Sequence, residues 1–226
     1  MKVIIDMGHP LNQGASSSFA NETTKNREVG NRLIAMLKEK GHSVVDVTYN
    51  GSNELYNRVT KANKYSNYDL YVSLHLNAYN GSAHGCETWV YSTHSKAYSI
   101  ARRTNDRLCR DIGWYNRGVK TSTGLYVLKN TIMPSMLIEM GFVDNLSDMQ
   151  KWNTEKICRA IYYGITGTEY IAPVTNNNSN SNNSKVIYRV AVNGKQIGAY
   201  SKVENILNEV KKAIANGSSE IKITKK

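Results

Sequence analysis

One short stretch of the sequence cannot belong to a folded core, and it divides the chain into two separate folding problems. Residues 175–183 read TNNNSNSNN, with no apolar side chain and no charge. Such a segment buries too little surface to offset the entropy of ordering it, which is typical of a linker. We therefore predict a large domain over residues 1–172, a flexible linker over 173–184 and a small domain over 185–226.

The large domain alternates between strand patterns and helix patterns. Short apolar runs such as KVIID and LYVSLH are typical of strands buried on both faces, and longer segments show helical periodicity. This alternation predicts an α/β domain with a mostly parallel sheet flanked by helices on both faces. The predicted strands are 2–6, 42–47, 70–75, 87–91 and 135–140, and the predicted helices are 21–40, 53–64, 97–112 and 148–166.

The small domain has a different pattern. Asn193-Gly194 lies between two strand-like runs, 188–192 and 195–200, and this dipeptide strongly favours a hairpin turn. Residues 203–215 are amphipathic at helical spacing, and 220–224 alternate as a last strand. The small domain is therefore expected to be a ββαβ unit.

The net charge of the chain is +11, and the small domain alone holds nine Lys and Arg against three Glu. Such a field favours a polyanionic partner, a description that fits cell wall, nucleic acid and anionic membrane alike. No apolar run approaches the roughly 20 residues of a membrane span. The first residues, MKVIID, run directly into a strand pattern, so we expect no signal peptide.

The three cysteines are odd in number and far apart in the sequence, at positions 86, 109 and 158. We therefore expect free thiols, without a disulfide framework or a cysteine zinc site.

Three side chains that can bind metal or transfer protons fall at the ends of predicted strands. His9 follows the first strand, His75 ends the third, and Glu139 lies near the end of the fifth. Ligands of open α/β sheets bind beyond the carboxyl ends of the strands. If these strands are neighbours in the sheet, the three side chains meet at one edge.

A fourth candidate, Glu22, is separated from its neighbour Glu28 by helical phase. At about 100° per residue, Glu22 falls on the core-facing stripe with Val29 and Leu33, whereas Glu28 points about 120° away. A buried acid must be paired, protonated or bound to metal. In the first turn it also gains from the helix dipole, so Glu22 is the expected ligand.

His9, Glu22 and His75 together offer two imidazoles and a carboxylate, which leaves a coordination position open as in catalytic zinc sites. Two imidazoles favour zinc over magnesium. Glu139 is then the candidate general base toward water and acid toward a leaving nitrogen. The chemistry alone leaves a structural role open for each histidine, because no HExxH motif is present.

Seven short blocks, in order along the large domain, resemble the zinc-dependent N-acetylmuramoyl-L-alanine amidases of bacterial autolysins and phage endolysins. They read VIIDMGHP, NETTKNREVGNRL, SLHLNA, GCETWVY, NRGVK, GLYVLKN and MPSMLIEMGFVDN. The resemblance implies zinc ligands at His9, Glu22 and His75 and a catalytic glutamate at Glu139. It also implies a mixed sheet and cleavage of the amide between muramic acid and L-alanine.

The first block departs from the usual Pro-Gly-His-Gly of that family, because this chain reads Met7-Gly8-His9-Pro10. Pro10 stiffens the turn after His9 and removes an amide donor. The sequence therefore does not determine the shape of the pocket wall beside His9. The segment YRVAVNGKQIGAYSKVENI of the small domain loosely resembles the sporulation-related repeat that binds glycan strands, although the domain is much shorter.

Several polar residues near these blocks carry two interpretations. Asp6 and Asn77 are candidates to orient the metal ligands, although Asp6 is equally well placed to cap its strand. Arg117 is a candidate contact for muropeptide carboxylates or a surface ion pair, and Glu87 a candidate hydrogen-bonding group at the pocket edge. The histidines that we expect to be solvated or structural are His42, His84 and His94.

The sequence thus predicts a peptidoglycan hydrolase, in a phage endolysin or an autolysin, that uses zinc-activated water. Its expected partner is bacterial peptidoglycan, and we expect the protein to stay in the cytoplasm until it is released to the wall. The alternatives are a non-catalytic basic protein that binds wall or nucleic acid, and a zinc peptidase that cuts a stem-peptide bond.

The small domain is predicted to bind cell wall or to dimerise, and no nucleic-acid partner is expected. A unit of about 40 residues is marginally stable alone without disulfides or metal. Two copies of residues 185–226 that complete a larger sheet would give a homodimer.

Overall fold

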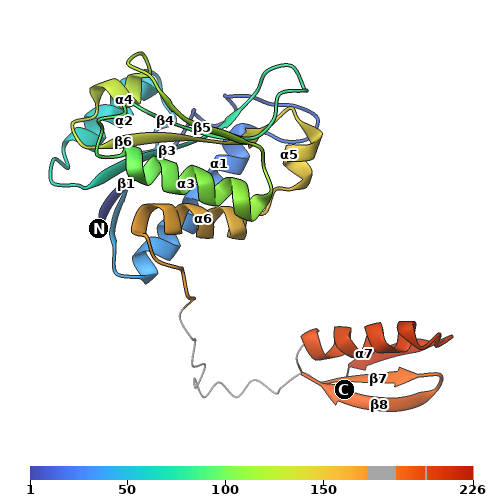
Figure 1. Cartoon of the computed structure of the whole chain (residues 1–226). Helices are drawn as coiled ribbons and strands as arrows, with labels where there is room; N and C mark the ends of the chain where they lie inside the picture. Colours follow the sequence, from blue (N-terminus) through green and yellow to red (C-terminus); the bar gives the residue numbers. More distant parts are fainter. Residues whose placement is uncertain (173–186, 202, 226) are drawn as a thin grey trace. The chain divides into compact units, whose positions relative to one another are not determined.

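The computed structural model describes residues 1–172, 187–201 and 203–225, which belong to two compact units, Met1–Pro173 and Val174–Lys226 (Figure 1). The predicted linker at 173–184 lies outside the described residues. Within the described part of the chain, no helix combines the length and the apolar character that crossing a membrane requires.

The large unit is built on a six-stranded sheet with the order β2-β1-β3-β6-β4-β5. Four neighbouring strands are parallel, and β4 and β5 run in the opposite direction because β4 pairs antiparallel with β6. The prediction of a mixed, mostly parallel sheet is therefore confirmed. The strands are β1 Lys2–Met7, β2 Ser43–Asp46, β3 Leu70–Asn77, β4 Cys86–Val90, β5 Asn116–Thr121 and β6 Ser135–Phe142.

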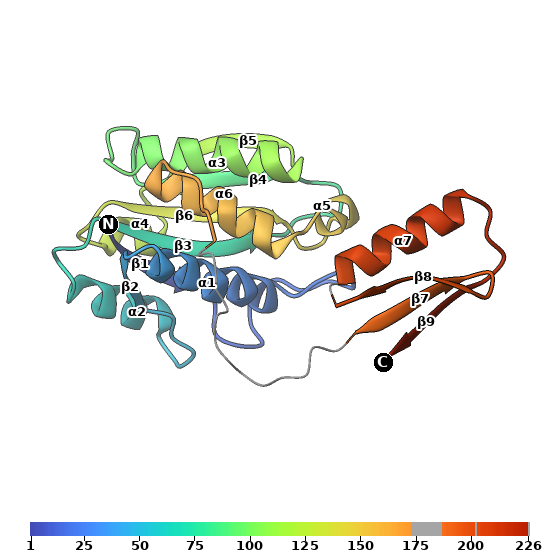
Figure 2. The ribbon, with the colours of Figure 1, turned by 90° about the horizontal axis from the view of Figure 1, so that it is seen from below.

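Helices cover both faces of this sheet, as predicted (Figures 1 and 2). One face packs against α1 Glu22–Glu39, α3 Tyr98–Ile112 and α6 Thr154–Thr166, and the other lies under α2 Glu54–Asn63 and α4 Tyr126–Asn130. Alternate residues of the central strands serve the two cores. Val72 and Leu74 belong to the first and Tyr71 to the second, which explains the nearly continuous apolar run in β3.

The structure differs from the sequence prediction in three places. The predicted helix at 148–166 is two helices, α5 Leu146–Gln150 and α6, because Asn153 turns out of the helix and its side chain caps the Lys156 amide. Strand β5 and the short helix α4 were not predicted. Strand β5 is a half-exposed edge strand, NRGVKT, with too few apolar residues to show alternation.

Helix α1 confirms the helical phase predicted for Glu22. Asn21 caps the helix by accepting a hydrogen bond from the Thr24 amide, which places Glu22 in the first turn. Glu22 is 1% exposed and shares the buried side with Val29 and Leu33. The side chain of Glu28 is 39% exposed and pairs with Lys25 on the surface.

The small unit has the predicted ββαβ order: β7 Tyr188–Val192, β8 Lys195–Tyr200, α7 Val203–Ala215 and β9 Ile221–Lys225. Its three strands form an antiparallel sheet with β7 in the centre. The hairpin turns at Asn193 and Gly194, both with positive φ (47° and 79°), as a tight two-residue turn requires.

Candidate metal centre

Two candidate residues lie beside each other on adjacent central strands. His75 of β3 is the register partner of Glu139 of β6. Glu139 is in turn directly opposite Glu87 of β4. Residues paired across neighbouring strands project from the same face, so these three side chains form a row across the carboxyl-terminal part of β3 and β6.

His9 reaches this row from the loop that follows β1. The loop turns sharply, because His9 has a φ of +59°, in the left-handed region that non-glycine residues rarely adopt. Arg27 of α1 donates hydrogen bonds to the carbonyls of Gly8 (2.8 Å) and His9, and Asn26 also donates to Gly8. These contacts stabilise the loop in this conformation.

Glu22 completes the cluster from the start of α1. Its Oε1 lies 3.0 Å from Nδ1 of His75 and 3.4 Å from Nε2 of His9, and it accepts a hydrogen bond from the Leu76 amide. Its Oε2 accepts one from the Ala15 amide. One ligand atom from each of the three side chains lies within 4.8 Å of the others, an arrangement that could hold a metal ion.

Two glycines leave room for this cluster. A Cβ on Gly8 would lie 2.1 Å from Cε1 of His75. At Gly14, which has a φ of +81°, it would lie 2.8 Å from Oε2 of Glu22 and 2.9 Å from Cδ2 of His9. No larger residue fits at either position without displacing a ligand, so the backbone is shaped around the three side chains.

The charges of the cluster are coupled. Burial raises the pKa of Glu22, but hydrogen bonds from His75 and His9 outweigh it and hold that pKa well below its ordinary value. Burial lowers the pKa of His75, and the hydrogen bond to Glu22 reverses this and raises it. Glu22 is thus an ionised carboxylate at neutral pH, the form that binds metal.

Glu139 has a different electrostatic setting. Burial, opposed in part by the nearby His75, raises its pKa to about 7, and the charges of Glu22 and Glu87 contribute to the rise. Its Oε2 is buried without a hydrogen-bond partner among the described residues. The carboxyl group of Glu139 is therefore held close to the cluster while remaining free to take up or release a proton.

Neither predicted orienting residue contacts a ligand side chain. Asp6 is buried on the same face, where it accepts hydrogen bonds from Tyr71 and Ser73 and pairs with Arg58 at 3.4 Å. Asn77 donates to Glu87. The side chain of Asp6 does not cap its strand either. Its Oδ2 accepts both hydroxyl hydrogen bonds, and its buried Oδ1 lies near Arg58 without a hydrogen-bond partner among the described residues.

Glu87 is more buried and accepts more hydrogen bonds than a residue at the pocket edge would. It is 3% exposed and accepts four hydrogen bonds: Oε1 from Asn77 and the Trp89 indole, Oε2 from Arg117 and Lys120. Arg117 forms an ion pair with this buried acid, and its side chain remains 30% exposed.

Sequence reasoning missed three residues of this region: Arg27, Arg58 and Lys120. Arg27 and Lys120 lie inside blocks that were already singled out, five residues after Glu22 and three after Arg117. Arg58 lies on the buried side of α2, where an arginine requires an acidic partner. An arginine on the buried side of this helix was therefore the one sign in the sequence of a buried polar cluster beneath the strands.

The remaining histidines and the cysteines lie outside the cluster. His84 contacts the carbonyl of Ser82 and the ring of Tyr115, His94 is exposed, and His42 lies beside the N-terminal amine and Tyr162. All three cysteines are free and buried, as expected.

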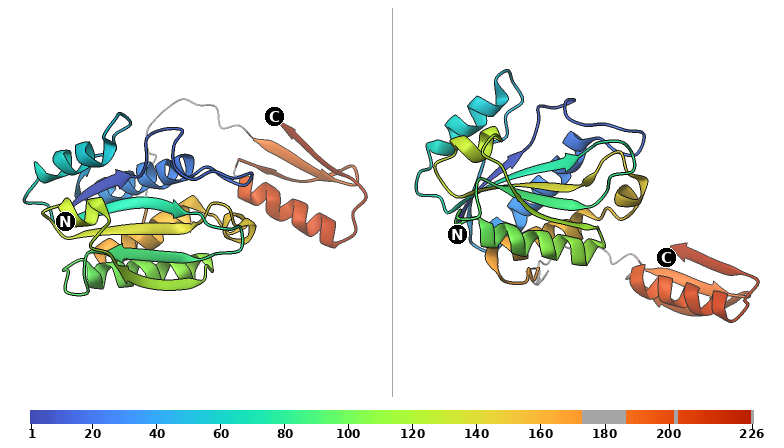
Figure 3. Two further views of the ribbon diagram at one scale, coloured as in Figure 1. Left: turned by 90° about the horizontal axis from the view of Figure 1, so that it is seen from above. Right: turned by 45° about the horizontal axis from the view of Figure 1, so that its top comes forward.

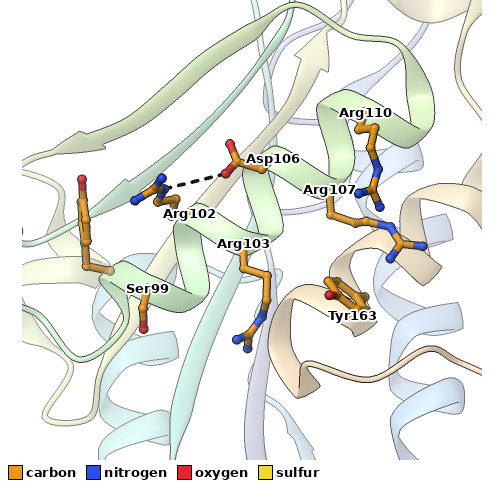
Figure 4. A pocket seen from close by; sticks show the side chains of 8 residues that line it. Ser99, Arg102, Arg103, Asp106, Arg107, Arg110 and Tyr163 are labelled. Atoms are coloured by element: carbon orange, nitrogen blue, oxygen red, sulfur yellow. Dashed lines mark ion pairs between the residues drawn. The ribbon is translucent and has the colours of Figure 1, made fainter.

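A separate hollow of about 490 Å³ lies on the other side of the sheet, over α3 and α6 (Figure 4). Its arginines serve the fold: Arg103 donates to the carbonyls of Gly164 and Ile165 at the end of α6, and Arg107 stacks 4.4 Å above the Tyr163 ring. Arg102 pairs only loosely with Asp106 at 3.8 Å. None of the metal-cluster residues lines this hollow.

The known proteins that resemble this chain match its large unit. Residues 3–168 match the family model described as N-acetylmuramoyl-L-alanine amidase. The chain is 36% identical over 157 residues to an uncharacterized protein of Clostridium perfringens, covering 66% of this chain and 46% of that protein. It is 31% identical over 172 residues to the N-acetylmuramoyl-L-alanine amidase LytC of Bacillus subtilis, covering 72% of this chain and 34% of LytC.

A solved structure shares the fold of the large unit. The catalytic domain of the CD27L endolysin targeting Clostridia difficile has a TM-score of 0.68 and 29% identity, covering 75% of this chain and 98% of that one. The chain spans about half or less of the length of the first curated relatives, namely 46%, 34% and 45%.

Proposed function

The chain belongs to the N-acetylmuramoyl-L-alanine amidase family, and from that premise we propose that it hydrolyses the amide between N-acetylmuramic acid and L-alanine in bacterial peptidoglycan. We place this activity in the lytic domain of an endolysin or an autolysin. The observation that carries the proposal is the meeting of His9, Glu22 and His75 beside a partnerless carboxyl oxygen of Glu139.

The resident metal in this proposal is zinc, held by His9, Glu22 and His75. Two imidazoles and one carboxylate suit zinc better than a hard cation. Donor atoms about 2.0–2.1 Å from a tetrahedral zinc lie about 3.3 Å apart, and the donors of Glu22 lie 3.0 and 3.4 Å from those of the two histidines. Bound zinc would polarise the scissile carbonyl and acidify a water molecule.

Glu139 performs the proton transfers in this mechanism. Its carboxylate accepts the proton of the attacking water and then returns it to the leaving nitrogen of L-alanine. Glu22 keeps its orientation throughout, because the Leu76 and Ala15 amides hold both of its oxygens. The positions of the acid and the proposed ligands are thus set by strands β3 and β6, by the loop after β1 and by the first turn of α1.

Replacing Glu139 tests this assignment. Glu139→Gln should lower the release of stem peptides from purified peptidoglycan by about 10²–10⁴-fold, because the proton-transfer group is lost, with bound zinc unchanged by elemental analysis. Glu28→Gln is the matched control, since Glu28 is an exposed carboxylate on α1. Mass spectrometry of the digest identifies the bond that is cut.

Three outcomes would contradict the proposal. Normal lysis by the Glu139→Gln protein would remove the catalytic assignment. Products cut within the stem peptide would indicate a zinc peptidase. Binding of wall without any cleavage by the unaltered protein would indicate a non-catalytic binding protein.

We assign the small unit to wall binding, on the grounds of its charge. It carries nine Lys and Arg against three Glu over residues 185–226. A basic module that holds the chain on an anionic wall raises the local concentration of the hydrolase at its substrate.

We also propose that two small units pair, giving a homodimer. Among the described residues of this unit, only Val190, Ile206 and Ala213 are buried apolar residues. Four large apolar side chains are exposed: Ile197, Leu207, Ile214 and Ile223. So small a core leaves the unit marginal alone, and a second copy could cover the exposed residues.

A further inference from the structure

Two cations lie side by side near Glu139, and neither has a role in the mechanism above. Nε of Arg117 and Nζ of Lys120 both lie 2.6 Å from the same oxygen of Glu87. We refer to Arg117 and Lys120 as the cation pair. Because Glu87 is directly opposite Glu139, the cation pair belongs to the same face of the sheet as the metal cluster.

A bulge in β5 makes this arrangement. Residues three apart in a regular strand project from opposite faces, so Arg117 and Lys120 would normally point away from each other. The register shifts between the pairs Cys86–Asn116 and Thr88–Val119, so that Arg117 and Gly118 together oppose Glu87. Gly118 has a φ of +79°, as a bulge of this kind favours.

Aromatic rings fix the direction of both cations. The guanidinium of Arg117 lies 5.0 Å above the Phe142 ring, and Nζ of Lys120 lies 5.3 Å from the centre of the Trp89 ring. A cation held between a buried carboxylate and an aromatic face has few conformations to lose when a ligand binds.

The charge of this group is not balanced. Glu87 is the only carboxylate among the described residues that pairs with either cation, so one positive charge remains uncompensated. The side chains of Arg117 and Lys120 are 30% and 34% exposed, whereas that of Glu87 is 3% exposed. The anion is covered and the cations face outward, which suits an incoming anion.

We propose that the cation pair binds a free carboxylate of the stem peptide. This inference rests on the proposed function, since it names a contact within that substrate. Neighbouring strands lie about 4.8 Å apart. The carboxylate of Glu87, which holds both cations, is on the strand next to that of Glu139, and β5 is the strand beyond it (Figure 3). The cation pair therefore lies between about 5 and 10 Å from Glu139. The first free carboxylate of the stem is the α-carboxylate of the acidic residue that follows L-alanine, about two residues from the scissile nitrogen, a span of roughly 7 Å.

The proposal also fixes the direction in which substrate lies. The muramic acid carboxyl is consumed in the scissile amide, and the sugar rings are neutral, so only the peptide side offers carboxylates. The peptide therefore extends from Glu139 across β4 to β5, and the glycan lies on the side of β1. Specificity for the acidic residue follows, because its amidated form offers no charge to the cation pair.

The test compares two muramoyl tripeptides that differ only in the second residue, which carries either a free α-carboxylate or the α-amide. Binding is measured by calorimetry on the zinc-loaded Glu139→Gln protein, and cleavage on the unaltered protein. We expect the acid to bind about tenfold more tightly than the amide. Equal affinities would overturn the inference whether or not cleavage is seen, whereas failure to cleave either compound would count against the proposed function.

Variants of Arg117 and Lys120 then test whether the preference for the acid arises at the cation pair. In the Glu139→Gln background, Lys120→Met and Arg117→Gln should each weaken binding of the acid and leave binding of the amide nearly unchanged, and Lys120→Arg should retain the preference. Arg102→Gln, an exposed arginine on α3, is the control for loss of one positive charge. Equal weakening of both ligands would indicate a structural role and overturn the assignment to the cation pair.

Discussion

At the scale of single residues, the least relaxed feature of the site is the backbone of His9. A φ of +59° costs a non-glycine residue about 1–2 kcal/mol. Arg27 and Asn26 offset that cost through hydrogen bonds to the carbonyls of the Gly8–His9 loop. The departure from the usual family sequence at Pro10 falls next to this strained residue.

Removing the guanidinium of Arg27 should therefore weaken metal binding without touching a ligand. We expect Arg27→Met to lower zinc affinity about 10–100-fold, the usual effect of losing a group that orients a metal ligand. Competition with a chromogenic chelator measures this. Arg102→Gln serves as the control, and a zinc affinity for Arg27→Met equal to that of the unaltered protein would show that the loop holds its shape unaided.

The role of a residue could be predicted from the sequence where a polar side chain falls at a position that should be buried. Glu22 could be separated from Glu28 because helical phase alone places one acid in the core and the other in solvent. Asp6 was misjudged because its partner, Arg58, arrives from α2, and the sequence gives no distance between them. Lys120 was missed because its direction depends on a one-residue bulge, which strand periodicity cannot reveal.

At the scale of elements, helices α3 and α6 pack unusually closely at one point. A Cβ on Gly164 would lie 2.1 Å from Oγ1 and 2.6 Å from Cα of Thr104. The second contact is with backbone, so no side-chain rotation relieves it, and the two helices would have to separate. Glycine at this position therefore sets the spacing of the helical layer under the sheet.

We expect Gly164→Ala to destabilise the large unit by about 1–3 kcal/mol, as overpacking usually does, which lowers the melting temperature by several degrees. Thermal unfolding followed by circular dichroism measures the change. Gly124→Ala is the control, because the nearest atom to an added Cβ there is 3.8 Å away. A melting temperature for Gly164→Ala no lower than that of the control would refute the close-packing argument.

Elements were predictable in proportion to their burial. Strands β1, β3 and β6 are nearly covered on both faces and appear in the sequence as apolar runs. Strand β5 is polar because it lies at the edge of the sheet, and the break before α6 depends on one capping asparagine, Asn153. Local capping chemistry and edge position are weak signals beside the periodicity of a buried helix or strand.

At the scale of the whole molecule, the composition of the sequence predicts two domains. The structure has two compact units, and the boundary between them falls between Pro173 and Val174. The order of elements in each unit could be anticipated from periodicity. The pairing of β4 with β6 in the antiparallel sense could not, because strand direction depends on which connection crosses the sheet.

A chain ending at residue 172 should separate the two proposed roles of the small unit. It should cleave a soluble muropeptide as fast as the full chain, but bind insoluble peptidoglycan more weakly and with less dependence on salt, because much of the positive charge is gone. In light scattering, the full chain should have a molar mass of twice the 25.3 kDa of one chain, and the truncated chain should be monomeric. Equal wall binding by both chains would remove the binding role, and a monomeric full chain would remove the pairing role.

The distribution of the site along the chain has a consequence for the order in which the enzyme is assembled. The three proposed metal ligands are all synthesised by position 75, on or next to β1, α1 and β3, whereas Glu139 follows later on β6. Strand β6 must then insert between β3 and β4 to complete the sheet. In the proposed mechanism the proton-transfer group is therefore the last of the four side chains to be synthesised, and hydrolysis requires the complete sheet.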